Sequence, residues 1–140
     1  MLGQLESFCY TCNYMAQVLL VEDDPFLSTL LKNRLQKEGL EVLLAKTGLE
    51  ALEILKKSQP DLVLLDLILP EKSGFEVLED MISNPQYGKP PVIIISNLGQ
   101  DQDIDRAKQL GVVDYFIKAQ TPIDDLVQKI KNYLSTVLKK

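Results

Sequence analysis

Four runs of apolar residues in this sequence end in side chains that could carry out chemistry. In chain order, these ends are Glu22-Asp23-Asp24, Asp66, Ser96 and Lys118. Carboxylates without histidine or cysteine favour a hard cation such as Mg²⁺, whereas an ammonium and a hydroxyl can hold phosphoryl oxygens. A carboxylate in such surroundings can accept a phosphoryl group, because the cation and the ammonium neutralise the transferred charge. The residue types therefore predict a phosphoryl-accepting site, provided that the fold brings the four ends together.

Asp66 is the centre of this hypothesis. It lies in the stretch Asp61–Pro70, where an apolar run is interrupted by one carboxylate and then stopped by proline. A short apolar run between breakers is typical of a strand buried on both faces of a parallel sheet. Because a lone buried charge is costly, we expect Asp66 at the exit of the strand, with partners from elsewhere in the chain.

Strands and helices are expected in strict alternation. The expected strands cover residues 17–21, 40–45, 61–66, 92–95 and 112–117, and the expected helices 25–38, 48–58, 73–83, 101–110 and 122–137. Pro25 suits the first position of a helix, with Asp24 as its cap. Leu49 is expected to face the core, and residues 84–89 to form a polar loop. Five strand–helix units predict an α/β fold, a parallel sheet with helices on both faces.

Composition limits the partners and the location. The 140 residues carry a net charge of -5, which argues against direct nucleic-acid binding, because phosphate contacts need clustered Lys and Arg. The apolar runs are too short to span a bilayer, and residues 1–16 contain neither Lys nor Arg and no apolar core of signal-peptide length. We therefore expect a cytoplasmic protein that binds neither a membrane nor nucleic acid directly.

Residues 1–16 are expected to be a leader outside the fold, with one domain over residues 17–140. The leader contains Cys9 and Cys12, a C-x-x-C spacing that can hold half a zinc site or a redox pair. A zinc site needs two more ligands, and the sequence has no other Cys and no His. A redox pair would follow a strand and begin a helix, a pattern that is absent here. Two incidental thiols are the favoured interpretation.

Residues 17–138 resemble a response-regulator receiver domain of two-component signalling, in the chemotaxis-regulator-like superfamily. The motifs that carry the resemblance are Val21-Glu22-Asp23-Asp24-Pro25, Leu64-Leu65-Asp66-Leu67-Ile68-Leu69-Pro70, Ser73-Gly74-Phe75, Ile94-Ile95-Ser96 and Asp114-Tyr115-Phe116-Ile117-Lys118. The resemblance implies a doubly wound, flavodoxin-like (βα)5 fold with strand order 2-1-3-4-5. In such folds, the functional crevice lies at the carboxyl ends of the strands.

The resemblance also implies a role for each residue of the acceptor and metal site. Asp66 would be the phosphoacceptor. A Mg²⁺ ion, for which Mn²⁺ could substitute, would be held by Asp23, Asp24, Asp66 and the backbone carbonyl of Ile68. No further cofactor is expected.

Three other residues would complete the receiver by this resemblance. Ser96 and Lys118 would bind the phosphoryl oxygens, and Lys118 would act in catalysis with Asp66. Tyr115 resembles the aromatic switch residue, which turns inward when Ser96 moves toward the phosphate. Core packing is the other reading of Tyr115, whose side chain falls on the strand face opposite Phe116.

The expected function is a phosphorelay receiver that takes its phosphoryl group from a histidine kinase or a histidine phosphotransfer protein. It would switch the surface of its fourth helix, fifth strand and fifth helix, which would bind an unknown downstream protein or a second copy. It would turn over no free substrate.

The alternative is a pseudo-receiver, an interaction module without phosphotransfer. An aspartate-nucleophile phosphatase would need an acid where Ile68 stands, and a flavodoxin a hydroxyl- and Gly-rich loop where Glu22-Asp23-Asp24 stands.

Two positions depart from the family pattern. Receivers usually have a cis proline after the lysine, but here Ala119 follows Lys118. A cis bond before a residue other than proline costs about 3 kcal/mol, so the bond is either held cis or is trans with Lys118 re-aimed.

The residue after Ser96 is usually small, but here it is Asn97. Together with the apolar Ile68, Asn97 is expected to hinder the attacking water and slow dephosphorylation.

Overall fold

A parallel sheet forms the middle layer of the protein, which the computed structural model describes over residues 15–138. Its five strands run in the order β2-β1-β3-β4-β5, which confirms the expected topology. The strands are β1 (Gln17–Val21), β2 (Glu41–Ala45), β3 (Leu62–Leu65), β4 (Val92–Ser96) and β5 (Asp114–Ile117). Because all four pairings are parallel, the carboxyl ends of the strands share one edge of the sheet.

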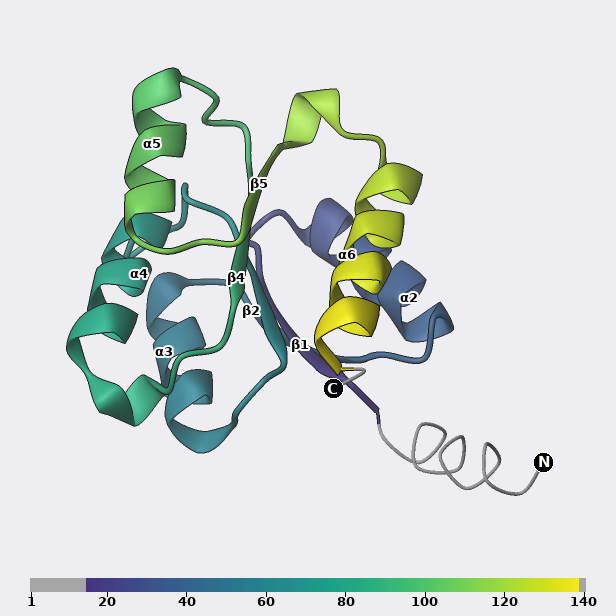
Figure 1. Cartoon of the computed structure of the whole chain (residues 1–140), viewed down its shortest axis with the longest axis horizontal. Coiled ribbons are helices and arrows are strands. Elements are labelled where there is room, and N and C mark those ends of the chain that lie inside the picture. Colours follow the sequence, from purple (N-terminus) through teal and green to yellow (C-terminus); the bar gives the residue numbers. More distant parts are fainter. Residues whose placement is uncertain (1–14, 139–140) are drawn as a thin grey trace.

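Five α-helices cover the two faces of this sheet in the described part of the chain (Figure 1). On one face lie α3 (Gly48–Lys57), α4 (Gly74–Ser83) and α5 (Asp101–Gln109), and on the other lie α2 (Pro25–Lys37) and α6 (Ile123–Leu138). Two short 3-10 turns, η1 (Pro85–Tyr87) and η2 (Lys118–Gln120), complete the elements. The architecture is the doubly wound α/β fold that the alternation of strands and helices predicts.

The apolar core is divided by the sheet into two clusters. Alternate residues of β1 serve the two sides: Leu19 and Val21 pack toward α3, α4 and α5, whereas Val18 and Leu20 pack toward α2 and α6. All four residues of β3 are buried, as expected for a central strand covered on both faces. This double burial explains the uninterrupted apolar run that precedes Asp66.

Side-chain caps fix where two of the helices begin at the functional edge. Asp24 Oδ1 accepts the Phe26 N–H at 3.0 Å and begins α2, as its position before Pro25 predicts. Ser73 begins α4 with a capping box, in which Ser73 and Glu76 each accept the other's backbone N–H. The helices after β1 and β3 therefore start close to the ends of those strands.

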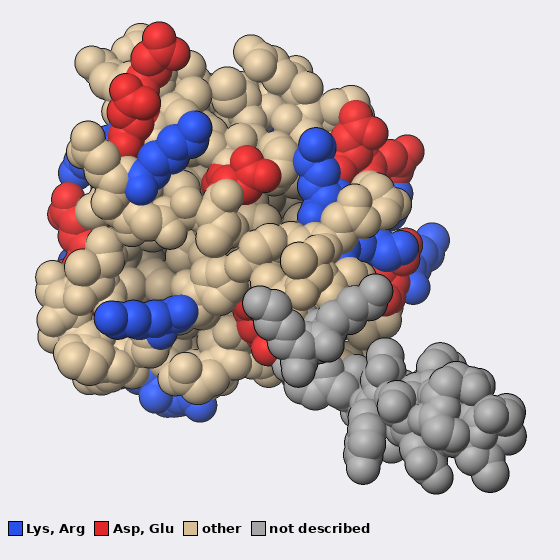
Figure 2. Space-filling model, in the orientation of Figure 1, with Lys and Arg blue, Asp and Glu red and all other residues tan. Residues whose placement is uncertain are grey.

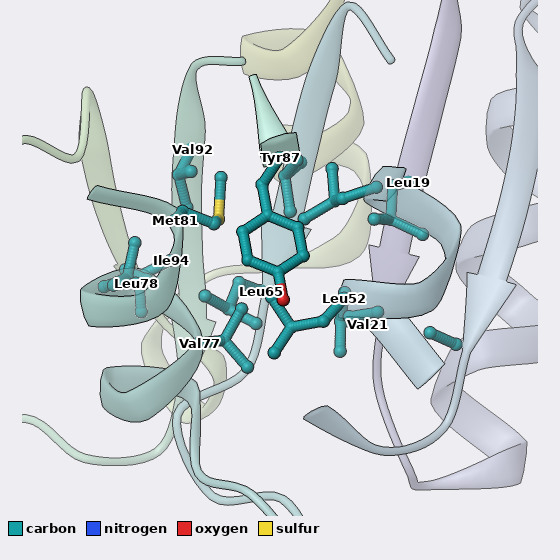
Figure 3. Packing of buried hydrophobic residues seen from close by; sticks show 14 of the residues in the cluster. Leu19, Val21, Leu52, Leu65, Val77, Leu78, Met81, Tyr87, Val92 and Ile94 are labelled. Carbon is teal, nitrogen blue, oxygen red and sulfur yellow. The ribbon is translucent and has the colours of Figure 1, made fainter. Parts of the chain in front are cut away.

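The bounds of the strands and helices differ from the expected ones by at most two residues, and the structure departs further from the expectation at three places. Residues 84–89 do not form only a polar loop, because Tyr87 of η1 is buried among core residues of the α3–α4 side (Figure 3). Leu49 does not face the core: its side chain is 50% exposed, while Leu52 and Leu55 of the same helix are buried. Ala16 belongs to the core although the expected leader included it, and residues 1–14, with Cys9 and Cys12, lie outside the described part.

The surface carries mixed charge. On the face shown in Figure 2, acidic and basic side chains are interspersed rather than gathered into a stripe of one sign. Among residues 15–138, no helix combines the length and apolar character that crossing a membrane requires.

Leu64 and Leu49 provide a matched test of the core. Leu64 on β3 is fully buried, and we expect Leu64→Ala to lower the free energy of unfolding by about 2–5 kcal/mol through lost burial and a cavity. Leu49→Ala removes the same atoms from a half-exposed helix position and should cost less than about 1 kcal/mol. Urea denaturation followed by circular dichroism measures both values, and equal losses would contradict the described packing.

Candidate functional site

The carboxyl ends of three strands bring an acid, a second acid and a lysine together. Glu22 directly follows β1, Asp66 directly follows β3 and Lys118 directly follows β5. Backbone bonds hold the two acids in place: the Glu22 N–H donates to the Ala45 carbonyl at 2.9 Å, and the Asp66 N–H donates to the Val21 carbonyl at 3.1 Å. Both carboxylates are therefore extensions of the sheet rather than parts of flexible loops.

Lys118 joins the two acids. Its Nζ lies 2.8 Å from Asp66 Oδ2 and 2.8 Å from Glu22 Oε1. Glu22 and Asp66 are 2% and 4% exposed, so each carboxylate has lost nearly all of its contact with bulk water. A shared ammonium is the compensation that such burial requires.

Burial and pairing shift the pKa values of this trio. Burial raises the pKa of Glu22, although its hydrogen bonds to Lys118 and to the Asp24 N–H oppose the shift. Burial alone would lower the pKa of Lys118, but the hydrogen bonds to Asp66 and Glu22 outweigh it, and the pKa of Lys118 is raised. Lys118 is therefore charged at neutral pH.

A third acid completes a candidate metal centre. One carboxylate oxygen each of Glu22, Asp23 and Asp66 lies within 4.8 Å of the other two, and the Asp23 side chain is exposed. Three carboxylates against the single charge of Lys118 leave the site negative. Oxygen ligands and excess negative charge suit a hard divalent cation such as Mg²⁺.

Asp24 lies outside this cluster, whereas the expected ligand set included it. Its carboxylate caps α2 through the Phe26 N–H, and its own N–H donates to Glu22 Oε2 at 3.0 Å. The residue missed as a candidate ligand is Glu22. The signal that could have found it was the position of Asp24 directly before Pro25, because a carboxylate that caps a helix is turned toward the helix N–H groups.

The loop after β3 holds the carboxylate oxygen of Asp66 that Lys118 does not contact. The Ile68 N–H donates to Asp66 Oδ1 at 3.2 Å, while the side chain of Ile68 is 56% exposed. The Gly74 N–H donates to the Leu67 carbonyl at 3.0 Å. A Cβ on Gly74 would lie 2.3 Å from the Asp66 carbonyl oxygen, so only glycine lets α4 approach this closely. The predicted role of the Ile68 carbonyl as a metal ligand stays a prediction.

Ser96 and Tyr115 are connected through Leu98. Ser96 is fully buried at the end of β4, and its Oγ accepts the Leu98 N–H at 3.3 Å. The Tyr115 hydroxyl donates to the Leu98 carbonyl. Tyr115 packs on the α3–α4 side of the sheet and Phe116 on the α2–α6 side, which confirms their predicted opposite faces. Burial, followed by the charges of Asp103 and Asp66, raises the pKa of Tyr115 to about 12, so the phenol remains a donor.

The peptide bond between Lys118 and Ala119 is trans, as no cis bond occurs among residues 15–138. Of the two possibilities that the sequence left open, the trans bond is present but the re-aiming of Lys118 is not. Lys118 Nζ still reaches Asp66 Oδ2 at 2.8 Å. The Ala119 N–H, which a proline would lack, donates to Asn97 Oδ1 at 3.1 Å.

A parallel sheet of order 2-1-3-4-5, with an acidic cluster and a lysine at its carboxyl edge, defines a receiver-type signalling domain. Comparison with known families agrees, because residues 18–131 match the model of the response regulator receiver domain. The chain belongs to this family.

Relatives and solved structures of this class cover nearly all of the chain. The polar-differentiation response regulator DivK of Brucella ovis is 31% identical over 117 residues, which is 84% of this chain and 94% of DivK. The phosphorylated cyanobacterial phytochrome response regulator RcpA superposes with a TM-score of 0.75 at 31% identity, covering 87% of this chain and 93% of RcpA. The Mn²⁺-bound form of response regulator Rcp1 gives 0.73 at 29% identity, covering 89% and 96%.

Metal titration can distinguish whether Glu22 or Asp24 takes part in binding the cation. We expect Glu22→Gln to weaken Mg²⁺ binding by roughly tenfold, because it removes one negative charge from beside the ion. Asp24→Asn keeps a good helix cap and should leave the dissociation constant unchanged. Isothermal titration calorimetry of both variants measures the difference. A larger loss in Asp24→Asn than in Glu22→Gln would restore the ligand set expected from the sequence.

Proposed function

We propose that this chain is a phosphorelay receiver in which Asp66 accepts a phosphoryl group from a histidine kinase or a histidine phosphotransfer protein. The observation that carries the proposal is the buried Asp66 carboxylate, paired with Lys118 Nζ at 2.8 Å and clustered with Glu22 and Asp23. A receiver of this kind works in the cytoplasm and turns over no free substrate.

The transfer is a displacement at phosphorus. A carboxylate oxygen of Asp66 forms the new bond to phosphorus as the bond to the nitrogen of the donor histidine breaks, and that nitrogen keeps the electron pair. Asp66 is suited to attack because its carboxylate is held in place by hydrogen bonds on both oxygens. Lys118 stabilises the negative charge on the phosphoryl oxygens, and Ser96 donates its hydroxyl to one of them afterwards.

Glu22, Asp23 and Asp66 fit a divalent cation, and with the Ile68 carbonyl they would hold Mg²⁺, or Mn²⁺ in its place. When bound, the ion would neutralise negative charge on the acceptor and the phosphoryl group. The fit rests on the ligand atoms and their charge. Three clustered carboxylates share a single ammonium, that of Lys118, so the site keeps an excess of negative charge. Glu22 replaces Asp24 in the proposed ligand set, for the geometric reason given above.

The hydrogen-bond chain from Ser96 to Tyr115 supports a switch. Ser96 Oγ accepts the Leu98 N–H, and Leu98 in turn accepts from Tyr115. A Ser96 that turns to a phosphoryl group gives up the Leu98 N–H, which frees the loop that holds Tyr115. The change reaches α5, β5 and α6, the fourth helix, fifth strand and fifth helix along the chain. This surface would then bind a downstream protein or a second copy.

Phosphodonor labelling tests the proposal. We expect intact-mass spectrometry to show one phosphoryl group on the wild type after incubation with phosphoramidate and Mg²⁺, and none on Asp66→Ala. Omission of Mg²⁺ should suppress the reaction, because the acidic cluster then repels the donor. Size-exclusion chromatography of the labelled protein reports any assembly with a second copy. An unlabelled wild type with intact fold would sink the proposal and favour the pseudo-receiver.

Ile68 provides a prediction about the lifetime of the phosphorylated state. Its side chain is 56% exposed in the loop that holds Asp66, where an apolar group disfavours an ordered attacking water. We expect Ile68→Asn to speed hydrolysis of the phosphorylated Asp66 several-fold, since an amide can hydrogen-bond that water. Decay of the labelled mass with time gives the rate. An Ile68→Leu control should match the parent, and a faster Ile68→Leu would argue against the water-orienting explanation.

A further inference from the structure

One hydrogen bond joins the two loops that carry the phosphoryl-binding residues. Asn97 Oδ1 accepts the Ala119 N–H at 3.1 Å. Asn97 directly follows Ser96 and Ala119 directly follows Lys118. The pairing of β4 with β5 ends at Ser96 and Ile117, so the bond continues this pairing past the end of the ladder with a side chain. It lies beside the acceptor site rather than inside it.

The bond fixes the backbone from which Lys118 extends. The Ala119 N–H belongs to the peptide unit that starts at the Lys118 carbonyl carbon, and this unit is planar. Holding the N–H therefore sets the ψ angle of Lys118. Ala119 is the second residue of the 3-10 turn η2, where an N–H has no acceptor within the turn. Asn97 supplies the acceptor that the turn lacks.

Lys118 depends on such a constraint more than the two acids do. Glu22 and Asp66 are anchored by backbone bonds to neighbouring strands. Lysine has a flexible four-carbon side chain, and its ammonium must meet two buried carboxylates at 2.8 Å each. Freedom in the Lys118 backbone adds to the freedom of its side chain, and both must be lost before the ion pairs form.

The contact needs a side chain with an acceptor at position 97 and a residue other than proline at position 119. A proline at position 119 would have no N–H to donate, and an alanine or glycine at position 97 would have no oxygen to accept it. Ala119 and Asn97, the two departures from the receiver pattern, are therefore the two halves of one contact.

We propose that Asn97 is a positioning residue for Lys118: through the Ala119 N–H it fixes the Lys118 backbone and thereby the ion pairs of Lys118 with Asp66 and Glu22. The effect on phosphorylation rests on the proposed function, whereas the effect on the backbone does not. The proposal also assigns a role to Ala119. That role belongs to its backbone N–H, so no other side chain at position 119 would improve it.

A double-mutant cycle tests the functional half. We expect Asn97→Ala to lower the rate of Asp66 labelling by phosphoramidate roughly three- to tenfold, the factor that corresponds to one net hydrogen bond. In an Ala119→Pro background the same change should have no effect, whatever the rate of that background, since the donor is already gone. Asn132→Ala is the matched control: its Oδ1 also accepts a hydrogen bond at an exposed position, but on α6. Equal losses in both backgrounds would overturn the proposal.

Amide hydrogen exchange tests the backbone half and needs no phosphorylation. The Ala119 N–H should exchange about tenfold faster in Asn97→Ala than in the wild type, and Asn97→Asp, which keeps an acceptor, should restore the protection. An unlabelled wild type with a protected Ala119 would refute the proposed function while upholding the positioning contact. Unchanged exchange in Asn97→Ala would refute the contact itself, whatever the labelling shows.

Discussion

The pairing of one ammonium with two buried carboxylates is the constraint on which the rest of this structure depends. Glu22 and Asp66 have almost no exposed surface, and Lys118 Nζ contacts both at 2.8 Å. Without the lysine, two like charges would face each other in a medium that screens poorly, which is among the most costly arrangements in a folded protein. The three strands that these residues follow must therefore end at the same edge of the sheet, which requires the strands to be parallel.

The strand order sets how long a side chain must be to reach from the end of β5 to Asp66. β4 separates β3 from β5, so Lys118 and Asp66 start from strands about 10 Å apart, twice the usual strand spacing. Only a long side chain bridges that span, and it must pass the end of β4. The residue there is Ser96, which is small and fully buried.

Much of this could be predicted from the sequence, because apolar runs and their polar ends are local signals. The strand order and the approach of Lys118 to Asp66 follow from such signals and the resemblance that they carry. Glu22 was left out of the expected ligand set because three consecutive acids look alike, although the cap predicted for Asp24 already set that residue apart. The burial of Tyr87 depends on packing between distant elements, which a polar stretch of sequence conceals.

The charge balance of the site shows why a phosphoryl group would disturb it. In the described part of the chain, no buried side-chain nitrogen or oxygen lacks a hydrogen-bond partner, so the cluster of Glu22, Asp66 and Lys118 is satisfied as it stands. Phosphorylation of Asp66 would turn one of the two carboxylates that share Lys118 into an acyl phosphate, which carries a more strongly charged group. The ammonium then cannot keep its present geometry toward Glu22 and serve the new oxygens equally. Such a rearrangement would follow from one lysine having two partners, and under our proposal the Asn97–Ala119 contact would keep the Lys118 backbone fixed while its side chain changes partner.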